Sequence, residues 1–196
     1  MEQSRCPWCL GDEEYIRYHD DEWGVPLWED RALFEMLVLE GAQAGLSWLT
    51  VLRRRGSYRA AFDLMEPEKI ARYGDGDIAR LMRNTGIIRN ERKIRSAIGN
   101  ARSFLSLRDR HGSFSRWLWD RVDGEPVINL PRTTADIPSS TPLSARISQE
   151  MRRRGFSFVG PTIMYAFMQA VGMVNDHLVT CCRARGARGT EERAHA

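Results

Sequence analysis

Cysteine and histidine side chains occur in pairs near both ends of the 196-residue chain. Cys6 and His19 have twelve residues between them. His177 and Cys181 are four positions apart, a spacing that places both on one face of a helical turn. Two thiolates and two imidazoles make a tetrahedral ligand set suited to Zn²⁺, and four protein ligands leave no position for water. The pattern therefore favours a structural metal site that closes a loop of about 158 residues and ties the two ends together.

The same residues have a plainer interpretation, in which the cysteines are small apolar residues and the histidines ordinary polar ones. Cys6 and Cys9 are separated by two residues, a spacing common in zinc sites, and Cys182 directly follows Cys181. Spacing alone therefore leaves open whether a metal binds and which thiolates bind it. In a reducing compartment, close cysteine pairs favour metal binding over disulfides.

Aromatic side chains are dense near the N-terminus, and one carboxyl group, Glu40, is expected beside an apolar helix face. A base flipped out of a DNA duplex needs flat faces to stack on, and a carboxylate can accept a hydrogen bond from its exocyclic amine. Taken singly, each ring is more often a core residue. The rings that together with this carboxylate could bind a purine are Trp8, Tyr15, Tyr18, Trp23 and Trp48.

A short segment, 155–160, lies between two predicted helices and has the pattern of a helix-hairpin-helix motif. Gly160 followed by Pro161 leaves backbone N–H groups free at a helix N-terminus, where a DNA phosphate binds without contacting a base. Arginines 152–154 would add positive charge. The alternative is a plain helix corner with a solvated arginine face. The hairpin residues predicted to contact DNA are Val159, Gly160 and Thr162.

The elements that position these residues are predicted to be helices. Apolar residues follow helical spacing from Asp30 to beyond Glu40, and again after a glycine-containing corner at 41–45. Longer patterns predict helices over about 90–110, 141–154 and 161–171. No alternating strand pattern is found anywhere in the sequence. The fold class is therefore all-α, a compact bundle of about eight to ten short helices.

Length and composition limit the number of domains, the kind of partner and the location of the protein. With 42% hydrophobic residues, the chain can bury one core, and we expect a single helical domain over 1–182 followed by a disordered polar tail, 183–196. Arginine supplies 27 of the 29 basic residues at a net charge of +3, which mildly favours an anionic partner, although a GC-rich coding sequence would also enrich arginine. The sequence has neither a signal-peptide pattern nor a membrane-spanning run, so we expect a cytoplasmic protein with no membrane partner.

Long ordered motifs, spread over about residues 6–182, resemble the 3-methyladenine DNA glycosylase I family. The N-terminal motifs are Tyr18-His19-Asp20-Asp21-Glu22-Trp23-Gly24-Val25-Pro26, Leu33-Phe34-Glu35-Met36, Leu39-Glu40-Gly41 and Gln43-Ala44-Gly45-Leu46-Ser47-Trp48. The later motifs are Thr85-Gly86-Ile87-Ile88-Arg89, Ile98-Gly99-Asn100-Ala101, Arg154-Gly155-Phe156, Phe158-Val159-Gly160 and Val174-Asn175-Asp176-His177.

The resemblance implies a helix-hairpin-helix glycosylase fold with one structural Zn²⁺ that joins the N- and C-terminal segments. The implied metal ligands are Cys6, His19, His177 and Cys181, which leaves Cys9 and Cys182 spare. Glu40 would bind the polar edge of the methylated adenine and act as the catalytic residue by electrostatic stabilisation. The five aromatic residues named above would form the pocket walls, and Gly45 with Leu46 would enter the DNA stack. Phe158 departs from the pattern, since other helix-hairpin-helix glycosylases have a glycine there.

The implied activity is that of a monofunctional DNA glycosylase in base excision repair. It would hydrolyse the N-glycosidic bond of 3-methyladenine in alkylated double-stranded DNA, acting as a monomer. Asp176 lies near the position of the aspartate that related glycosylases use, but the family resemblance does not make it catalytic. A lyase reaction through a Schiff base is disfavoured, because neither lysine, Lys69 or Lys93, neighbours the pocket motifs. The alternative function is a non-catalytic, zinc-stapled protein that binds damaged DNA.

Overall fold

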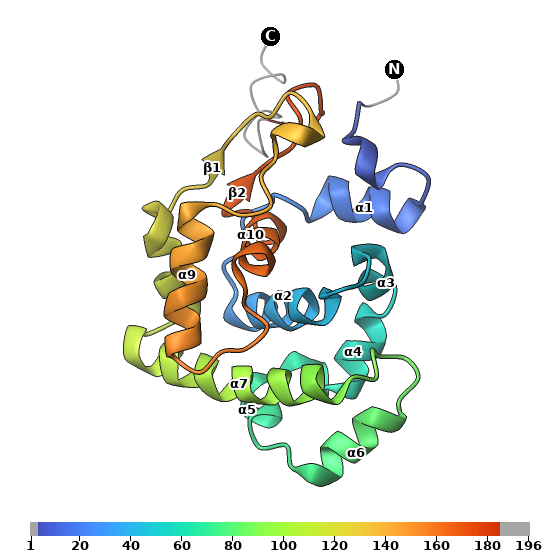
Figure 1. Cartoon of the computed structure of the whole chain (residues 1–196), viewed down its shortest axis with the longest axis vertical. Helices are drawn as coiled ribbons and strands as arrows, with labels where there is room; N and C mark the ends of the chain where they lie inside the picture. The colour runs from blue at the N-terminus through green and yellow to red at the C-terminus, as the bar shows by residue number, and fades with distance from the viewer. Residues whose placement is uncertain (1–3, 185–196) are drawn as a thin grey trace.

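The computed structural model describes residues 4–184, and within them the chain forms ten α-helices and two very short strands (Figure 1). The expected all-α bundle of short helices is confirmed. Residues 185–196 of the predicted tail lie outside the described part of the chain. The helices are α1 Glu13–Asp21, α2 Asp30–Gln43, α3 Trp48–Leu52, α4 Arg55–Ala61, α5 Pro67–Ile70, α6 Asp75–Arg83, α7 Glu91–His111, α8 Phe114–Trp119, α9 Pro142–Arg153 and α10 Pro161–Ala170. The strands are β1 Val127–Ile128 and β2 Val174–Asn175.

Helix α2 is the central element, with α10 and α7 on either side of it (Figure 1). Every residue from Leu33 to Ala42 is buried, as expected for a helix that is apolar on nearly all faces. One buried carboxylate in this stretch, Glu35, accepts hydrogen bonds from Arg55 and Arg59, which compensate its burial. The apolar helix therefore carries its second carboxyl group, Glu40, into the interior.

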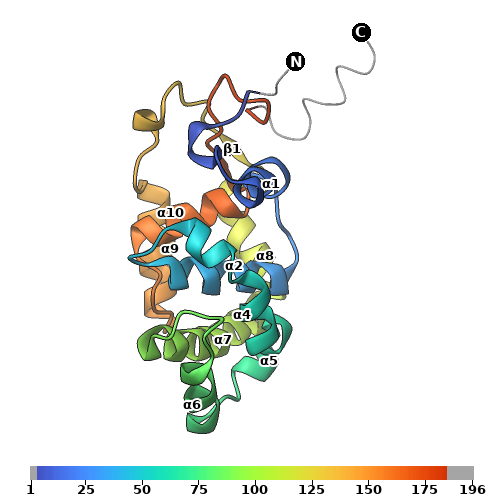
Figure 2. The same cartoon turned by 90° about the vertical axis from the view of Figure 1, so that its right-hand side faces the viewer.

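Helix α7 is the longest helix between residues 4 and 184, and it runs below α2 in both views (Figure 2). The side chain of Asn90 caps its N-terminus by accepting from the backbone N–H of Lys93, and Gly112 ends it with a φ of 83°. The predicted bounds agree with the structure to within about a residue. Phe104, buried on this helix, packs edge-to-face against Phe34 of α2.

Strands β1 and β2 form a parallel pair in which Val127 faces Val174. Two-residue strands are too short to show an alternating pattern, so this pair gives no signal in the sequence and leaves the fold class all-α. The pair places Asn129 and Asp176, the residues that directly follow β1 and β2, next to each other.

The segment between α1 and α2 lies across the end of α10. The backbone N–H of Gly24 donates to the carbonyl of Gln169, and that of Leu27 donates to Val171. Gly172 permits this approach, since its φ is 71° and a Cβ atom there would lie 2.3 Å from the carbonyl carbon of Val25. The contacts fix the position of Trp23 above α10.

The two ends of the described chain lie together at one end of the molecule in both views (Figure 1, Figure 2). The backbone N–H of Cys182 donates to the carbonyl of Ser4 over 2.8 Å. Within residues 4–184, no helix combines the length and the apolar character needed to cross a membrane.

Candidate active site and metal centre

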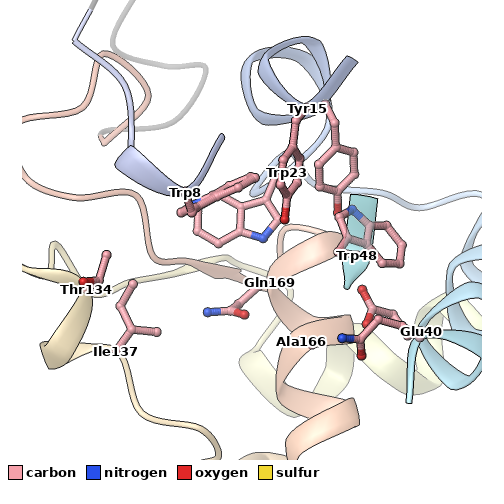
Figure 3. A pocket seen from close by; sticks show the side chains of 11 residues that line it. Trp8, Tyr15, Trp23, Glu40, Trp48, Thr134, Ile137, Ala166 and Gln169 are labelled. Atoms are coloured by element: carbon pink, nitrogen blue, oxygen red, sulfur yellow. The ribbon is translucent and has the colours of Figure 1, made fainter. Parts of the chain in front are cut away.

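A pocket of about 380 Å³ opens between α1, α2, α3 and α10 (Figure 3). This volume falls within the range of small-molecule sites, about 300–1,000 Å³. All five aromatic residues expected from the sequence line it, together with Glu40. The complete lining is Trp8, Tyr15, Tyr18, Trp23, Glu40, Gln43, Trp48, Thr134, Ile137, Ala166 and Gln169.

Glu40 lies in the last turn of α2 and is only 4% exposed. No group within residues 4–184 donates a hydrogen bond to its carboxyl group, in contrast to the paired Glu35 on the same helix. Burial raises the pKa of Glu40 from 4.5 to about 8. The carboxyl group is therefore mostly protonated at neutral pH in the empty pocket, and a ligand that donates hydrogen bonds or carries positive charge would favour its ionised form.

The aromatic rings meet mainly at their edges. The ring centroid of Trp8 lies 4.8 Å from that of Tyr15 and 5.0 Å from that of Trp23, both in edge-to-face geometry. The ring centroids of Tyr18 and Trp48 are 5.4 Å apart. Edge contacts leave ring faces available for a flat ligand. The indole Nε1 of Trp48 is buried and has no hydrogen-bond partner within the described residues.

Local sequence explains how these rings are held. Trp8 follows Pro7 at the start of a short 3₁₀-helix, Pro7–Cys9, and the side chain of Asp12 caps α1 by accepting from the N–H of Tyr15. Ser47 caps α3, whose first residue is Trp48. Tyr15 and Trp48 therefore stand in the first turns of helices whose starts are fixed by side-chain caps.

Sequence analysis did not identify the remaining lining residues. Gln43 lies within a quoted motif and is one helical turn from Glu40, so helical spacing could have indicated it. The other four residues come from distant parts of the chain and carry no local signal. Those four are Thr134, Ile137, Ala166 and Gln169.

The corner after α2 exposes the residues predicted to enter DNA. Gly45 has a φ of 78°, and Leu46 is 37% exposed although it is apolar. The side chain of Gln43 donates to the carbonyl of Leu46 over 2.8 Å, which closes the corner. The expectation that neither lysine neighbours the pocket motifs is wrong for Lys93, since its Nζ donates to backbone carbonyls on either side of Gln43.

The turn between α9 and α10 matches the predicted segment. The side chain of Val159 is buried, Gly160 is the N-cap residue of α10, and Thr162 is exposed. Phe158 has a φ of 54°, a conformation that glycine adopts more readily. Asn100 of α7 holds the turn, because its side chain bonds both the N–H and the carbonyl of Ser157 at 2.9 Å.

The three arginines before this turn do not share one role. A Cβ atom at Gly160 would lie 3.4 Å from a guanidinium nitrogen of Arg152, so this cation lies beside the start of α10. Arg153 is exposed. Arg154 pairs with Glu150 at 3.0 Å, a carboxylate that Arg121 also contacts, so its guanidinium is turned toward α9.

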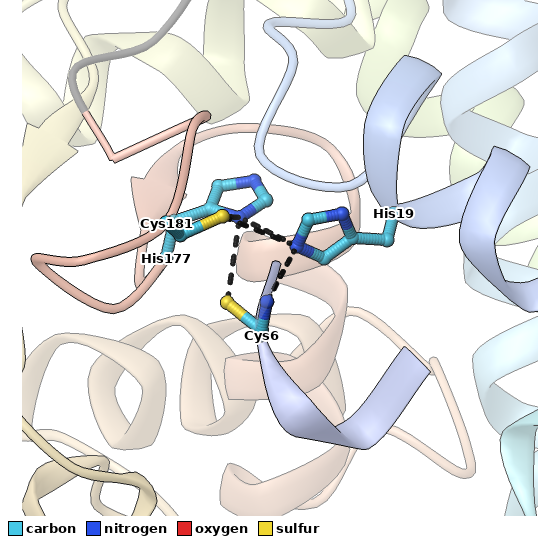
Figure 4. A group of neighbouring side chains, drawn as sticks. All are labelled: Cys6, His19, His177 and Cys181. Carbon is cyan, nitrogen blue, oxygen red and sulfur yellow. Dashed lines mark hydrogen bonds between the residues drawn. The ribbon is translucent and has the colours of Figure 1, made fainter. Parts of the chain in front are cut away.

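The two ends of the chain meet in a buried cluster of thiols and imidazoles that could hold a metal ion (Figure 4). The ligand atoms of Cys6, His19, His177 and Cys181 all lie within 4.8 Å of one another. Nε2 of His19 is 3.1 Å from Nδ1 of His177. Sγ of Cys181 lies 3.4 and 3.5 Å from these two nitrogens, and Sγ of Cys6 lies 3.7 Å from His177.

The outer ring nitrogens fix the chemistry of this cluster. Nδ1 of His19 lies 2.7 Å from the carboxylate of Asp20, and Nε2 of His177 lies 3.0 Å from the carbonyl of Trp23. Because both partners are acceptors, each outer nitrogen carries a hydrogen, and the inner nitrogens of neutral rings present lone pairs to each other. Converging lone pairs and thiols are the donor set of a metal site.

The two spare cysteines lie outside this cluster. The thiol of Cys9 is buried and donates to the carbonyl of Cys6 over 3.1 Å. Burial raises the pKa of Cys9 to about 11, which opposes a role as a thiolate ligand. Cys182 is exposed. Among the thiolates that spacing left open, the structure brings together Cys6 and Cys181 and not Cys9 or Cys182.

The helical fold, the buried carboxyl group among aromatic faces and the exposed apolar corner define a protein with a built pocket for a flat ligand. Comparison with known proteins extends this description. The sequence model of the family described as Methyladenine glycosylase matches residues 8–184. The chain belongs to the methyladenine glycosylase family.

The chain matches individual relatives over nearly their whole length. The chain is 48% identical to DNA-3-methyladenine glycosylase 1 of Escherichia coli (strain K12), over 91% of this chain and 95% of that protein. It is 43% identical to DNA-3-methyladenine glycosylase of Haemophilus influenzae, over 91% and 96%. A crystal structure of 3-methyladenine DNA glycosylase I superposes with a TM-score of 0.89 at 49% identity, over 91% of this chain and 98% of that one. A complex of such an enzyme with 3-methyladenine superposes with a TM-score of 0.88 at 35% identity, over 91% and 96%.

Proposed function

We propose that this chain is a monofunctional DNA glycosylase that excises 3-methyladenine from alkylated double-stranded DNA by hydrolysing the N-glycosidic bond. The observation that carries the proposal is the unpaired, buried carboxyl group of Glu40 in an aromatic pocket of the size of a small-molecule site. Similarity to enzymes named for this reaction, over more than nine tenths of the chain, supports it.

The reaction needs little acid or base catalysis. Methylation at N3 gives the base in the nucleoside a positive charge, so the glycosidic bond is already weak. The protein must mainly flip the nucleotide out, select the base and hold it. Glu40, ionised when it faces the cationic base, would stabilise the departing base in a pocket from which water is largely excluded, where electrostatic interactions are strong.

The two exposed loops supply the DNA contacts in this proposal. Leu46 would fill the space that the flipped nucleotide leaves in the stack, as apolar wedges do in other DNA-distorting proteins. The helix-hairpin-helix segment would bind a phosphate through the backbone N–H groups of Gly160 and Thr162, with Arg152 beside them. All of these groups come from one chain, which supports action as a monomer.

The metal in the buried cluster would be Zn²⁺ in a structural role. Zinc bonds of about 2.3 Å to sulfur and 2.0 Å to nitrogen, in tetrahedral geometry, separate ligand atoms by about 3.5 Å (S to N) and 3.3 Å (N to N). Three of the sulfur-to-nitrogen distances here are 3.4–3.7 Å and the nitrogen-to-nitrogen distance is 3.1 Å, values close to those of such an ion, and all four ligand atoms lie within 4.8 Å of one another. Reduced cysteines and a substrate in cellular DNA support a cytoplasmic location.

Release of free base from alkylated DNA tests the function. The wild type should release 3-methyladenine, and Glu40→Gln should release it much more slowly. Glu91→Gln, an exposed carboxylate paired with Arg95, is the matched control and should release it at the wild-type rate. A wild type that binds alkylated DNA but releases no base would instead support the non-catalytic damage-binding protein.

Trapping with borohydride tests the hydrolytic mechanism separately. A Schiff-base lyase would leave a covalent adduct between protein and DNA. We expect none, because Lys93 is held by two backbone carbonyls and Lys69 pairs with Glu66 at the surface. An adduct that is lost in Lys93→Met would overturn the monofunctional assignment.

A further inference from the structure

Asp176 is a buried carboxylate whose hydrogen bonds reach into the pocket. It is 1% exposed and follows β2. Its Oδ2 accepts from the hydroxyl of Tyr165 over 2.6 Å and from Nε2 of Gln169 over 2.7 Å, and its Oδ1 accepts from Nδ2 of Asn129 over 2.7 Å. Three donors occupy most of the roughly four acceptor sites on its two oxygens, so Asp176 is engaged in holding its neighbours.

The contact with Asp176 fixes which way the amide of Gln169 points. A carboxylate only accepts hydrogen bonds, so Gln169 must turn its NH₂ group toward it. The backbone of Gln169 is also held, because its carbonyl accepts from the N–H groups of Gly24 and Gly172. With the amide plane fixed, Oε1 is left as the free end, and no group within residues 4–184 donates to it.

Gln169 lines the pocket on the wall formed by α10, beside Ala166, and its labelled side chain lies between Ile137 and Glu40 in the view (Figure 3). The free amide oxygen therefore offers the pocket an acceptor and no donor. On neutral 3-methyladenine, the ring nitrogens N1, N7 and N9 are acceptors, and the exocyclic amine is the sole donor. The exocyclic amine is therefore the one group of the base that can form a hydrogen bond with an acceptor in this wall.

We infer that Gln169 is a specificity-determining residue, which recognises the exocyclic amine of the base through its side-chain oxygen and is oriented for this by Asp176. The inference rests on the proposed function and deepens it. Asp176 is a positioning residue here, since it acts through Gln169. The arrangement would disfavour bases that present an acceptor at this edge, because two facing acceptors leave a polar group without a partner.

Binding of two free bases tests this inference. The probes are 3-methyladenine and 3-methylpurine, which keeps the N3 methyl group but lacks the amine, and quenching of the pocket tryptophans gives both dissociation constants. Gln169→Met keeps the side-chain length but removes the acceptor. We expect it to weaken 3-methyladenine binding about 3–10-fold, the range of one lost hydrogen bond, and to leave 3-methylpurine binding unchanged. Equal weakening of both bases, or of neither, would overturn the inference.

Two further variants test the positioning role. Asp176→Asn can donate as well as accept, so the amide of Gln169 is free to turn, and the preference for 3-methyladenine over 3-methylpurine should fall as in Gln169→Met. Tyr165→Phe removes another donor to Asp176 without touching Gln169 and should keep the preference, even if it lowers stability. A preference that is unchanged in a folded Asp176→Asn protein contradicts the positioning role.

The outcomes separate the two proposals. If the wild type neither binds 3-methyladenine nor releases it from DNA, the proposed function fails. If the wild type does both and Gln169→Met retains the full preference for the amine, the inference alone fails. Should Asp176→Asn not fold, Gln169→Met still decides the role of Gln169.

Discussion

The inner ring nitrogens of His19 and His177 face each other at 3.1 Å, although the residues are 158 positions apart in the chain. The outer nitrogens are anchored to Asp20 and to the carbonyl of Trp23, so neither ring can turn away without losing a partly buried hydrogen bond. Trp23 is also a pocket wall. The cluster of two cysteines and two histidines therefore supports the pocket directly, through the residue that carries the anchoring carbonyl.

Loss of the metal should release the N-terminal and C-terminal segments from each other and destabilise the fold. We expect His177→Ala, or treatment with a strong chelator, to lower stability by about 3–5 kcal/mol and Tm by roughly 10 °C, because a long loop is no longer closed. Metal analysis and thermal unfolding with and without chelator measure both effects. Cys182→Ser, an exposed cysteine outside the cluster, should keep one metal ion per chain. A purified protein that binds no zinc and is indifferent to chelator would contradict the assignment.

Glu40 should make the protein less stable as the pH rises. Its pKa is about 8 in the folded chain against an ordinary value of 4.5, so between these values the folded state holds a proton that the unfolded state has lost. The group's contribution is favourable at acidic pH, declines by up to about 1.4 kcal/mol per pH unit and levels off above pH 8.

The variant Glu40→Gln lacks this titration. Its Tm should match that of the wild type near pH 4.5 and exceed it increasingly up to about pH 8. Glu68→Gln is the control with the opposite sign, since the hydrogen bond from Arg108 lowers the pKa of Glu68. Parallel Tm curves for the wild type and Glu40→Gln would show that Glu40 has an ordinary pKa.

Trp48→Ala should weaken binding of 3-methyladenine by about 10–100-fold, since stacking of one base on an aromatic ring contributes about 1–3 kcal/mol. Trp28→Ala is a matched control, because Trp28 is half-exposed and stacks on Trp119 at 4.0 Å, outside the pocket lining. Titration of the free base by calorimetry gives both constants. Similar losses in the two variants would place the base elsewhere.

Asn100→Ala should loosen the turn that leads into α10. It leaves the N–H of Ser157 without its partner, and the carbonyl of Ser157 keeps only the hydroxyl of Ser96, at a cost of about 1–3 kcal/mol. DNA affinity should fall as well. Asn90→Ala removes the cap of α7 at a cost of about 1 kcal/mol and should not change DNA affinity. Urea unfolding measures the stability of the two variants, and fluorescence anisotropy with duplex DNA measures their DNA affinity. Unchanged DNA binding in Asn100→Ala would argue against the turn as a DNA contact.

Lys93→Met should affect the corner that carries Leu46. The ammonium group donates to the carbonyls of Ala42 and Ala44 at 2.8 and 2.7 Å, so its loss should cost about 1–2 kcal/mol and weaken DNA binding. The other lysine provides the control, since Lys69→Met removes only a surface ion pair with Glu66 and should change neither property measurably. Equal effects of the two variants on stability and DNA binding would show that Lys93 has no special role at the corner.

Local signals in the sequence determined the helices and much of the site. Caps and helical periodicity placed α7 and α10 to within a residue or two, because these signals depend only on near neighbours. The motifs also predicted the pocket aromatics and the ligand set that the structure brings together. Roles assigned from a pattern, such as Leu46 entering DNA, stay predictions.

Only the tertiary structure decided what depends on contacts between distant segments. It joined β1 to β2, turned Arg154 toward Glu150 and placed Gln169 in the pocket under the control of Asp176. It also separated two carboxyl groups on one helix: Glu35 is paired with arginines, whereas burial without a partner raises the pKa of Glu40 to about 8. Sequence could place both on an apolar helix, but the protonation of each depends on what the rest of the chain brings within hydrogen-bonding distance.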